Sequence, residues 1–207
     1  MKKLFFLFCL LAVLSPLLRA QEARQDVSFS FMGTIQPYVE GGAPNDVRIK
    51  STLGTGLLLS YRFQLTPNGA VEANYSYSHF TEKFTTNTAF TPVRVYTGQQ
   101  EATFAYVRTI PFKRFNPFLD LGGGIQFFTP ISPGTSTYDT EQTESIVGQF
   151  GGGIAYELSP SWDLRVEYRA YVSHPPDFGL TNKLGNNFST GRLYIVSQPA
   201  VGIAYHF

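Results

Sequence analysis

The sequence predicts an all-β fold: one eight-stranded, antiparallel, up-and-down transmembrane β-barrel. Three observations predict it. Several segments alternate apolar and polar side chains with period two, as strands with two different faces do. The segments between them alternate between short and long, as expected when one end of a barrel carries tight turns and the other carries loops. After the first twenty residues no apolar run approaches the length of a membrane-spanning helix, so a position in a membrane would require a closed barrel.

Residues 1–20 are expected to be a cleaved secretory signal peptide, and the mature chain is expected to begin at Gln21. Lys2-Lys3 precedes an apolar run from Leu4 to Leu14, and the small residue Ala20 stands before the cut. The run has eleven residues, too few to span a bilayer. It also holds the only cysteine, Cys9, so the mature chain can form no disulfide and no cysteine-based site.

The charge of the mature chain argues against a nucleic-acid partner. Removing two lysines and one arginine with the signal peptide leaves 13 basic side chains against 15 acidic ones, a formal charge near −2. Residues 21–207 suit a single all-β domain.

The clearest strand pattern runs from Trp162 to Val172. Its apolar face holds Trp162, Leu164, Val166, Tyr168, Ala170 and Val172, and its other face holds Asp163, Arg165, Glu167, Arg169 and Tyr171. The same reading along the chain gives eight strands: Val27 to Val39, Ser51 to Phe63, Val71 to Ser78, Glu101 to Ile110, Phe118 to Phe128, Ile146 to Leu158, Trp162 to Val172, and Leu193 to Phe207. Their lengths are close to or above the roughly 9 to 11 residues that a tilted membrane strand needs.

The connections between these strands predict the orientation of the barrel. Three are short and rich in Pro, Asn and Gly: Gln64 to Gly69, Pro111 to Asn116, and Ser159 to Ser161. Four are long: Glu40 to Lys50, Thr81 to Gln100, Thr129 to Ser145, and Ser173 to Arg192. With the N-terminus on the periplasmic side, the long loops face outward.

The glycines and the aromatic side chains predict which face is inside. A soluble barrel would show the same alternation with the opposite sense, its apolar face enclosed. Seven glycines share strand phase with polar side chains, where a glycine relieves crowding inside a narrow barrel: Gly54, Gly56, Gly122, Gly124, Gly151, Gly153 and Gly202. Most aromatic side chains lie on the apolar phase, several near strand ends, as in a membrane-interface belt. The glycine-rich polar face is therefore predicted to be the interior.

The last strand ends in a pattern typical of an exported barrel. Counting back by two from Phe207 gives Tyr205, Ile203 and Val201 on one apolar face, followed by Pro199. Val201, Ile203, Tyr205 and Phe207 resemble the terminal signature by which assembly machinery recognises outer-membrane barrel precursors, and Pro199 departs from its usual apolar residue.

Two further stretches carry a family resemblance. Asn116 to Gly124 and Leu164 to Arg169 are similar to the recurring strand patterns of the OmpA-like and OmpW-like outer-membrane barrel domains. The resemblance spans essentially all of residues 21–207 and implies a place in the bacterial outer membrane. Because such members include structural anchors, adhesins and small pores, it implies location more than activity.

Charged residues on the inward phase form the candidate site. They are Arg62, Glu72, Glu101, Asp120, Glu157, Asp163, Arg165, Glu167 and Arg169. Enclosed charges must be paired, so a salt-bridged network that fills the lumen is the favoured interpretation. The alternative is a selectivity constriction in a narrow conducting path.

The sequence predicts neither a catalytic site nor a metal site. Ser173-His174 near Asp177, and Ser78-His79 near Glu82, contain the residue types of a hydrolytic triad. Neighbouring strand residues point to opposite faces, however, so these serines and histidines are not expected to form nucleophile and base. Lipid A deacylase barrels have His and Ser spaced by one residue, which this sequence lacks. The histidines have no ligand spacing and the glycine triplets no following helix, so no metal, cofactor or phosphate loop is expected.

The sequence leaves more than one function open. The first hypothesis is a non-enzymatic, monomeric barrel that stabilises the envelope or presents loops outside the cell. Its partners would be outer-membrane lipid, the assembly machinery and an extracellular ligand bound through the long loops. The alternatives are a narrow pore or carrier for small or apolar solutes, as in the OmpW-like branch, and a lipid A-modifying enzyme.

Overall fold

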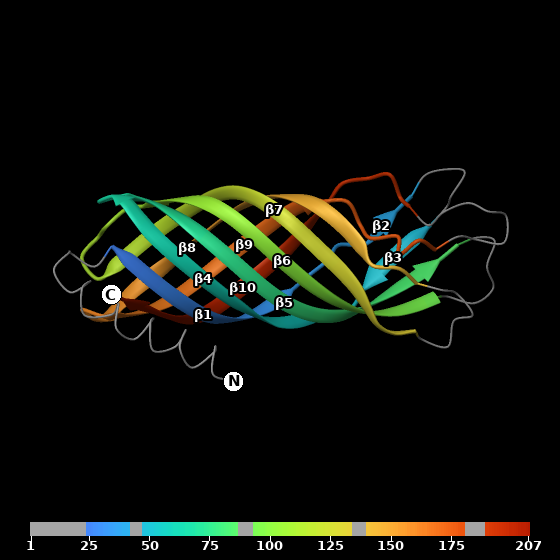
Figure 1. Ribbon diagram of the computed structural model, residues 1–207, viewed down its shortest axis with the longest axis horizontal. Coiled ribbons are helices and arrows are strands. Elements are labelled where there is room, and N and C mark those ends of the chain that lie inside the picture. Colours follow the sequence, from blue (N-terminus) through green and yellow to red (C-terminus); the bar gives the residue numbers. More distant parts are fainter. Residues whose placement is uncertain (1–23, 42–46, 87–92, 134–139, 181–188) are drawn as a thin grey trace, which may run out of the picture.

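A single antiparallel sheet curls into a closed barrel (Figure 1). The computed structural model describes residues 24–41, 47–86, 93–133, 140–180 and 189–207, so the predicted signal peptide lies outside the described residues. Eight long strands form the wall: β1 (Gln25–Thr34), β4 (Gly54–Thr66), β5 (Gly69–Thr85), β6 (Val93–Thr109), β7 (Phe115–Pro133), β8 (Thr143–Ser159), β9 (Trp162–Ser173) and β10 (Tyr194–His206). Two short strands lie at one end of the barrel: β2 (Val39–Glu40) pairs with β3 (Arg48–Ser51), and β3 pairs with the last residues of β5.

The pairing of the strands follows the chain and then closes. Each wall strand pairs with the next, β1 pairs with β10, and β3 continues the β4 side of β5 beyond the end of β4. Both β1 and β10 have their outer ends at the chain termini, and the short turns between β4 and β5, β6 and β7, and β8 and β9 lie at that same end, on the left in Figure 1. We call this the terminal end and the opposite one the loop end. Within the described residues no helix is long and apolar enough to cross a membrane.

The predicted all-β fold and its eight-stranded closure are confirmed, but several boundaries were wrong. β1 ends at Thr34 rather than Val39: Ile35 still bridges Ser197 of β10, and the chain then continues into the short strands β2 and β3. The largest error concerns the predicted loop from Thr81 to Gln100. Its described ends are strand: β5 continues to Thr85 and β6 begins at Val93, with Phe84 opposite Val93.

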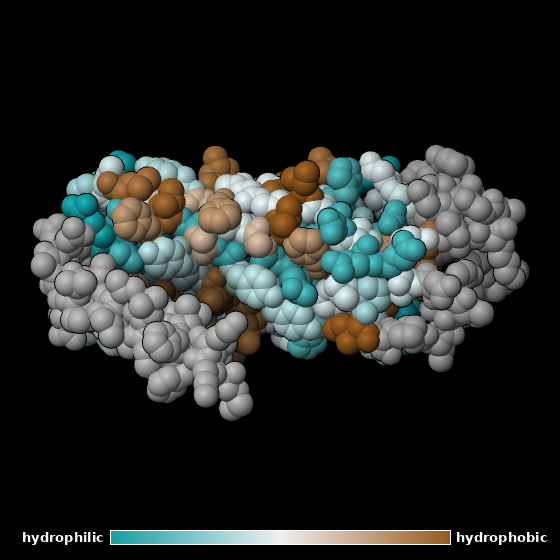
Figure 2. All heavy atoms as spheres, in the orientation of Figure 1, coloured by the Kyte–Doolittle hydropathy of each residue, from teal (hydrophilic) through white to brown (hydrophobic). Residues whose placement is uncertain are grey.

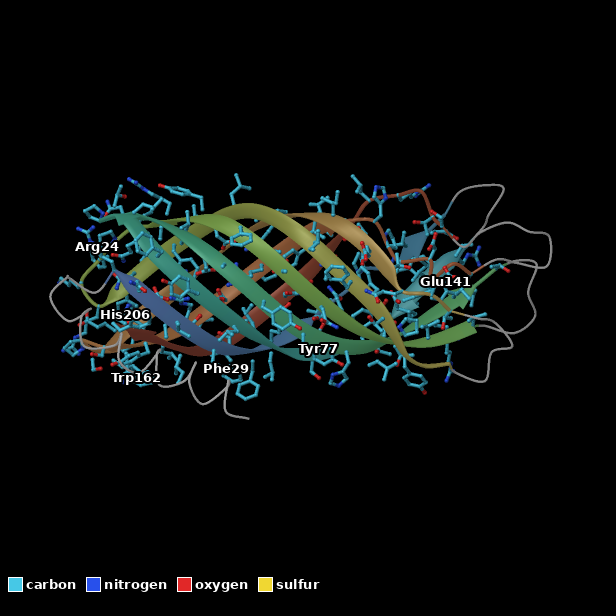
Figure 3. The ribbon with its side chains drawn as sticks, in the orientation of Figure 1. Arg24, Phe29, Tyr77, Glu141, Trp162 and His206 are labelled. Carbon is cyan, nitrogen blue, oxygen red and sulfur yellow. The ribbon has the colours of Figure 1, made fainter. Side chains whose placement is uncertain are left out.

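The predicted assignment of faces agrees with the structure. Leu164, Val166 and Tyr168 are 38%, 52% and 49% exposed, whereas Arg165 and Glu167 are 1% and 3% exposed. Apolar side chains are spread over the outer wall in Figure 2, and Phe29, Trp162 and Tyr77 lie on that wall in Figure 3. The apolar face is therefore the one available to lipid, as membrane barrels require.

Two glycines show how closely the strands approach one another. A Cβ at Gly122 would lie against the carbonyl oxygen of Phe104 on β6, and a Cβ at Gly124 against that of Ala102. Each of these two Cβ positions would lie closer to the carbonyl oxygen than Cβ atoms in real proteins approach a backbone atom. The obstacle at these two glycines is the neighbouring backbone rather than the crowded side chains that the sequence predicts.

The two faces exchange polarity towards the loop end of β5. Near the middle of the strand the outward residues are Tyr75 and Tyr77 and the inward ones are serines. Beyond His79 the inward residues Phe80 and Phe84 are buried and apolar, with the buried Glu82 between them, while Lys83 points outward. An apolar inside with a polar outside is the pattern of a barrel surrounded by water. This part of the hairpin therefore extends beyond the apolar band of the wall.

Candidate functional site

The paired charges of the barrel interior lie near the terminal end, and Glu72 of β5 lies at their centre. One of its carboxylate oxygens lies 2.6 Å from Nη2 of Arg62 and 3.6 Å from Nη1 of Arg165, and the other accepts a hydrogen bond of 3.0 Å from Arg169. The arginines come from β4 and β9, on different sides of the lumen. All four side chains are almost fully buried, so these ion pairs join strands across the barrel.

Two further carboxylates complete the cluster. Arg165 donates to Asp26 of β1 at 2.8 Å, and Arg169 donates to Glu167 at 3.0 Å. We call Asp26, Arg62, Glu72, Arg165, Glu167 and Arg169 the charge cluster. It contains three cations and three anions, the balance that enclosed charges need.

Asp26 is the member that sequence reasoning missed. The predicted strand began one residue later, at Val27. Asp26 shares the inward phase of Ser28 and Ser30, and its register partner on β10 is His206. An earlier start for this strand would have placed the carboxylate inside.

An aromatic ring lies against the arginines. The guanidinium of Arg62 lies 4.7 Å from the ring centroid of Phe118, and that of Arg165 lies 5.8 Å from it. Phe118 is buried on β7, on the inward phase. A buried ring face stabilises nearby cations without supplying a negative charge.

Hydrogen-bonding side chains fill the next layer towards the loop end. Asp120 accepts a hydrogen bond of 2.8 Å from Gln149. Glu101 accepts hydrogen bonds from Ser76 and from three glutamine amides, those of Gln99, Gln126 and Gln198. Both carboxylates were predicted to lie inside and both do, but their partners in the described residues are amides and a hydroxyl rather than arginines.

The remaining two predicted site residues lie at the terminal mouth. Asp163 is buried and its Oδ2 lies 2.9 Å from Nε2 of His206, so it pairs with a histidine outside the charge cluster. Glu157 is half-buried on β8, opposite Asp163 in the register, and is in none of the ion pairs found among the described residues.

The interior at the loop end is mostly apolar, although the buried Glu82 lies there, bonded to Thr97. One cluster of buried side chains there comprises Val47, Ile49, Phe80, Phe84, Val93, Val95, Phe128, Phe178 and Leu180. We call it the apolar plug. Phe84 of β5 meets Phe178 edge to face at 5.9 Å between ring centroids, which joins the wall to the segment after β9. Sequence reasoning missed this plug because most of it falls in segments that were predicted to be loops.

The two triad-like sets are not assembled. Ser78 is buried inside the barrel while His79 faces outward, and Glu82 is buried and bonded to Thr97. Ser173 donates to Gln126 in the interior, whereas His174 is exposed. Within the described residues there is also no group of three or more His, Cys, Asp or Glu side chains that could hold a metal ion.

This geometry crosslinks the wall from inside. The charge cluster connects β1, β4, β5 and β9, the Glu101 layer adds β6, β7 and β10, and the apolar plug fills the loop end. A wall of eight strands encloses a space that side chains can fill. The described interior side chains therefore connect strands from both sides of the lumen.

The family is established by a match over almost the whole chain. A family model for the outer membrane protein β-barrel domain matches residues 6–207. The chain belongs to this family. The predicted resemblance to outer-membrane barrels is confirmed at this level, and the family indicates the bacterial outer membrane. A search of curated proteins gives no match.

Solved barrels from this class share the fold. The outer membrane protein OprG from Pseudomonas aeruginosa superposes with a TM-score of 0.60 at 14% identity, covering 90% of this chain and 97% of that one. Neisserial surface protein A gives 0.55 at 12% identity, with 88% and 97% covered. The outer membrane protein AlkL, solved in lipid bilayers, gives 0.50 at 20% identity, with 91% and 92% covered. At these identities the likeness shows the fold alone.

Proposed function

We propose that this protein is a non-conducting, non-enzymatic outer-membrane barrel that stabilises the envelope or presents its loop end to partners outside the cell. The observation that carries this proposal is the charge cluster, in which Glu72 holds three arginines from both sides of the lumen. An ion that followed the axis would have to displace these pairs and then cross the apolar plug. Both barriers favour a closed scaffold.

Single-channel recording tests this proposal. The purified, refolded protein is inserted into planar bilayers, and a general porin serves as the conducting control. We expect no resolved conductance steps at voltages where the porin conducts. Reproducible steps whose size follows the salt concentration would overturn the closed-barrel proposal.

A carrier for small apolar solutes is the second candidate, favoured by a hollow in the outer wall. The hollow of about 480 Å³ lies over β1, β4, β9 and β10, where Gly33 and Pro199 leave little side-chain cover. Its lining includes the outward residues Phe31, Val166 and Val201, so it is an apolar hollow on the surface that faces lipid. An apolar molecule in the membrane could enter there.

A filling variant tests the carrier function. A deletion strain is complemented with the wild type, with Gly33→Phe, or with Gly148→Phe, which places the same ring where a Cβ meets open space. If the hollow carries solute, Gly33→Phe should be the one complemented strain that fails to take up an apolar growth substrate, and it should match the deletion strain. Equal uptake in all strains, including the deletion, would exclude this role.

We further propose that the last strand is the segment recognised by the assembly machinery. Val201, Ile203, Tyr205 and Phe207 all point outward and are exposed on the wall. Removal of Phe207 should therefore lower the amount of heat-modifiable, folded protein in the membrane fraction, whereas Leu193→Ala, at the other end of the wall, should not.

Catalysis is tested separately: overproduction of the protein should leave the mass spectrum of lipid A unchanged.

A further inference from the structure

Three cations face outward side by side at the loop end of the barrel. Lys50 of β3 lies opposite Lys83 of β5, and Lys83 lies opposite Arg94 of β6. Their neighbours Ile49 and Phe84 are buried in the interior, so the cations project away from the barrel. The three strands lie together at the right of Figure 1. We call Lys50, Lys83 and Arg94 the cationic row.

The described side chains around this row do not neutralise it. Like charges placed directly opposite on neighbouring strands repel each other. The acidic side chains of β5 and β6, which are Glu72, Glu82 and Glu101, all point inward and are buried. On β2, Glu40 pairs with Arg48 at 2.6 Å. Within the described residues the row therefore has no carboxylate partner, although it would be stabilised by an anion.

A hollow in the wall lies next to the row, on the side of the membrane band. It measures about 540 Å³, and three of its lining side chains, Leu53, Tyr96 and Ile131, are 68%, 48% and 56% exposed. Tyr96 lies two residues after Arg94 on β6, a distance of about 7 Å along the strand. Thr81 of β5 also lines the hollow and stands equally close to Lys83.

We propose that the cationic row and this hollow bind a phosphorylated lipid of the outer leaflet, with its phosphate against the row and an acyl chain in the hollow. From the membrane outwards, the wall offers apolar surface, then the hollow with hydroxyl groups, then cations. A lipid presents acyl chain, polar linkage and phosphate in the same order. Several basic side chains at a membrane surface hold anionic headgroups, and ammonium and guanidinium groups form charge-assisted hydrogen bonds with phosphate. The site does not depend on whether the lumen conducts.

Binding of defined lipids to the detergent-purified, full-length folded protein tests the proposal. The probes are bisphosphorylated lipid A, the same lipid without phosphate, and its deacylated sugar phosphate. The test variant is Lys50→Gln/Lys83→Gln/Arg94→Gln. The matched control is Arg24→Gln/Arg108→Gln/Arg114→Gln, which removes the same charge from exposed side chains at the terminal end.

The wild type and the control should bind bisphosphorylated lipid A equally. The row variant should bind it roughly 100-fold more weakly, at about five-fold for each cation. Equal binding by the row variant, or an equal loss in the control, would overturn the proposal. The lipid without phosphate should not distinguish the variants. Undiminished binding of the deacylated sugar phosphate would remove the hollow from the site.

Heat-modifiable migration on a gel establishes that each variant is folded. If the triple variant does not fold, Lys50→Gln and Arg94→Gln carry the test separately. Each should weaken binding about five-fold, and the loss should shrink as salt concentration rises. A single-variant affinity equal to that of the wild type at low salt would contradict the proposal.

Discussion

At the scale of single residues, Glu72 is the side chain on which the interior most depends. It is the one carboxylate that contacts all three arginines of the charge cluster, and it is buried with them. Removing one partner from a buried network leaves the others uncompensated, which costs more than the intact pair contributes.

Glu72→Gln keeps the shape of the side chain and removes its charge. We expect it to lower the free energy of unfolding by about 3 to 5 kcal/mol, because Arg62 is left without a carboxylate and Arg165 and Arg169 keep only one each. Urea unfolding in lipid vesicles measures the change. Glu144→Gln, an exposed carboxylate on β8, should change stability by less than about 0.5 kcal/mol. Equal effects of the two substitutions would show that the charge cluster does not stabilise the barrel.

Gly124 tests the close approach of β6 and β7. Gly124→Ala would press a methyl group into the backbone of Ala102 and Thr103, so we expect a loss of about 1 to 3 kcal/mol or more. Gly148→Ala on β8 meets nothing within 4 Å and should be neutral or stabilising by up to about 1 kcal/mol. The same unfolding assay compares them. A neutral Gly124→Ala would mean that the two strands can separate at little cost.

At the scale of the strands, the exchange of faces along β5 and β6 is the main structural feature. The charged and amide-rich layers lie where the wall is apolar, and the apolar plug lies where the wall carries cations. Apolar and polar side chains alternate in both regions, but the apolar side chains face outward beside lipid and inward where water surrounds the strands. The strands therefore extend as a water-surrounded hairpin above a membrane-surrounded barrel.

Phe84→Ala tests whether the plug holds the loop end together. Removing this buried ring should cost about 3 to 5 kcal/mol in the packing of the hairpin, and amide exchange should rise at the loop ends of β5 and β6. The terminal halves of these strands should keep their protection. Lys83→Ala, the outward neighbour on the same strand, should leave exchange nearly unchanged. Unaltered exchange in Phe84→Ala would contradict a stabilising role for the plug.

Period-two alternation was sufficient to predict the strands inside the membrane band, but not their extensions. From Trp162 to Val172 one face is apolar and the other is mostly charged, so the sequence predicts both the strand and the face that points inward. In Thr81 to Thr85 the inward phase contains Glu82 and Phe84, and the outward phase contains Lys83. Neither face of this segment is uniformly apolar, so the pattern does not indicate which face points outward. Hairpin pairing, which depends on both strands, decides the structure instead.

At the scale of the whole molecule, the candidate site depends on closure of the barrel. The inward phase of each charged residue could be predicted from its own strand. Which charges meet could not, because Glu72 and Arg169 are 97 positions apart and are brought together only when the sheet curls. For the same reason the sequence did not distinguish Glu101, which meets amides, from Glu72, which meets arginines.

The central claim is that lipid surrounds the apolar wall while the charges lie inside. Trp162 is the only tryptophan in the chain and is 43% exposed on that wall near the terminal end. Its fluorescence can therefore be quenched selectively by lipids brominated at known depths. We expect bromine near the headgroup to quench Trp162 most, and deeper bromine to quench Trp162→Phe/Val166→Trp most, since Val166 lies about 13 Å further along β9. Emission that no brominated lipid quenches in either protein would contradict the claim.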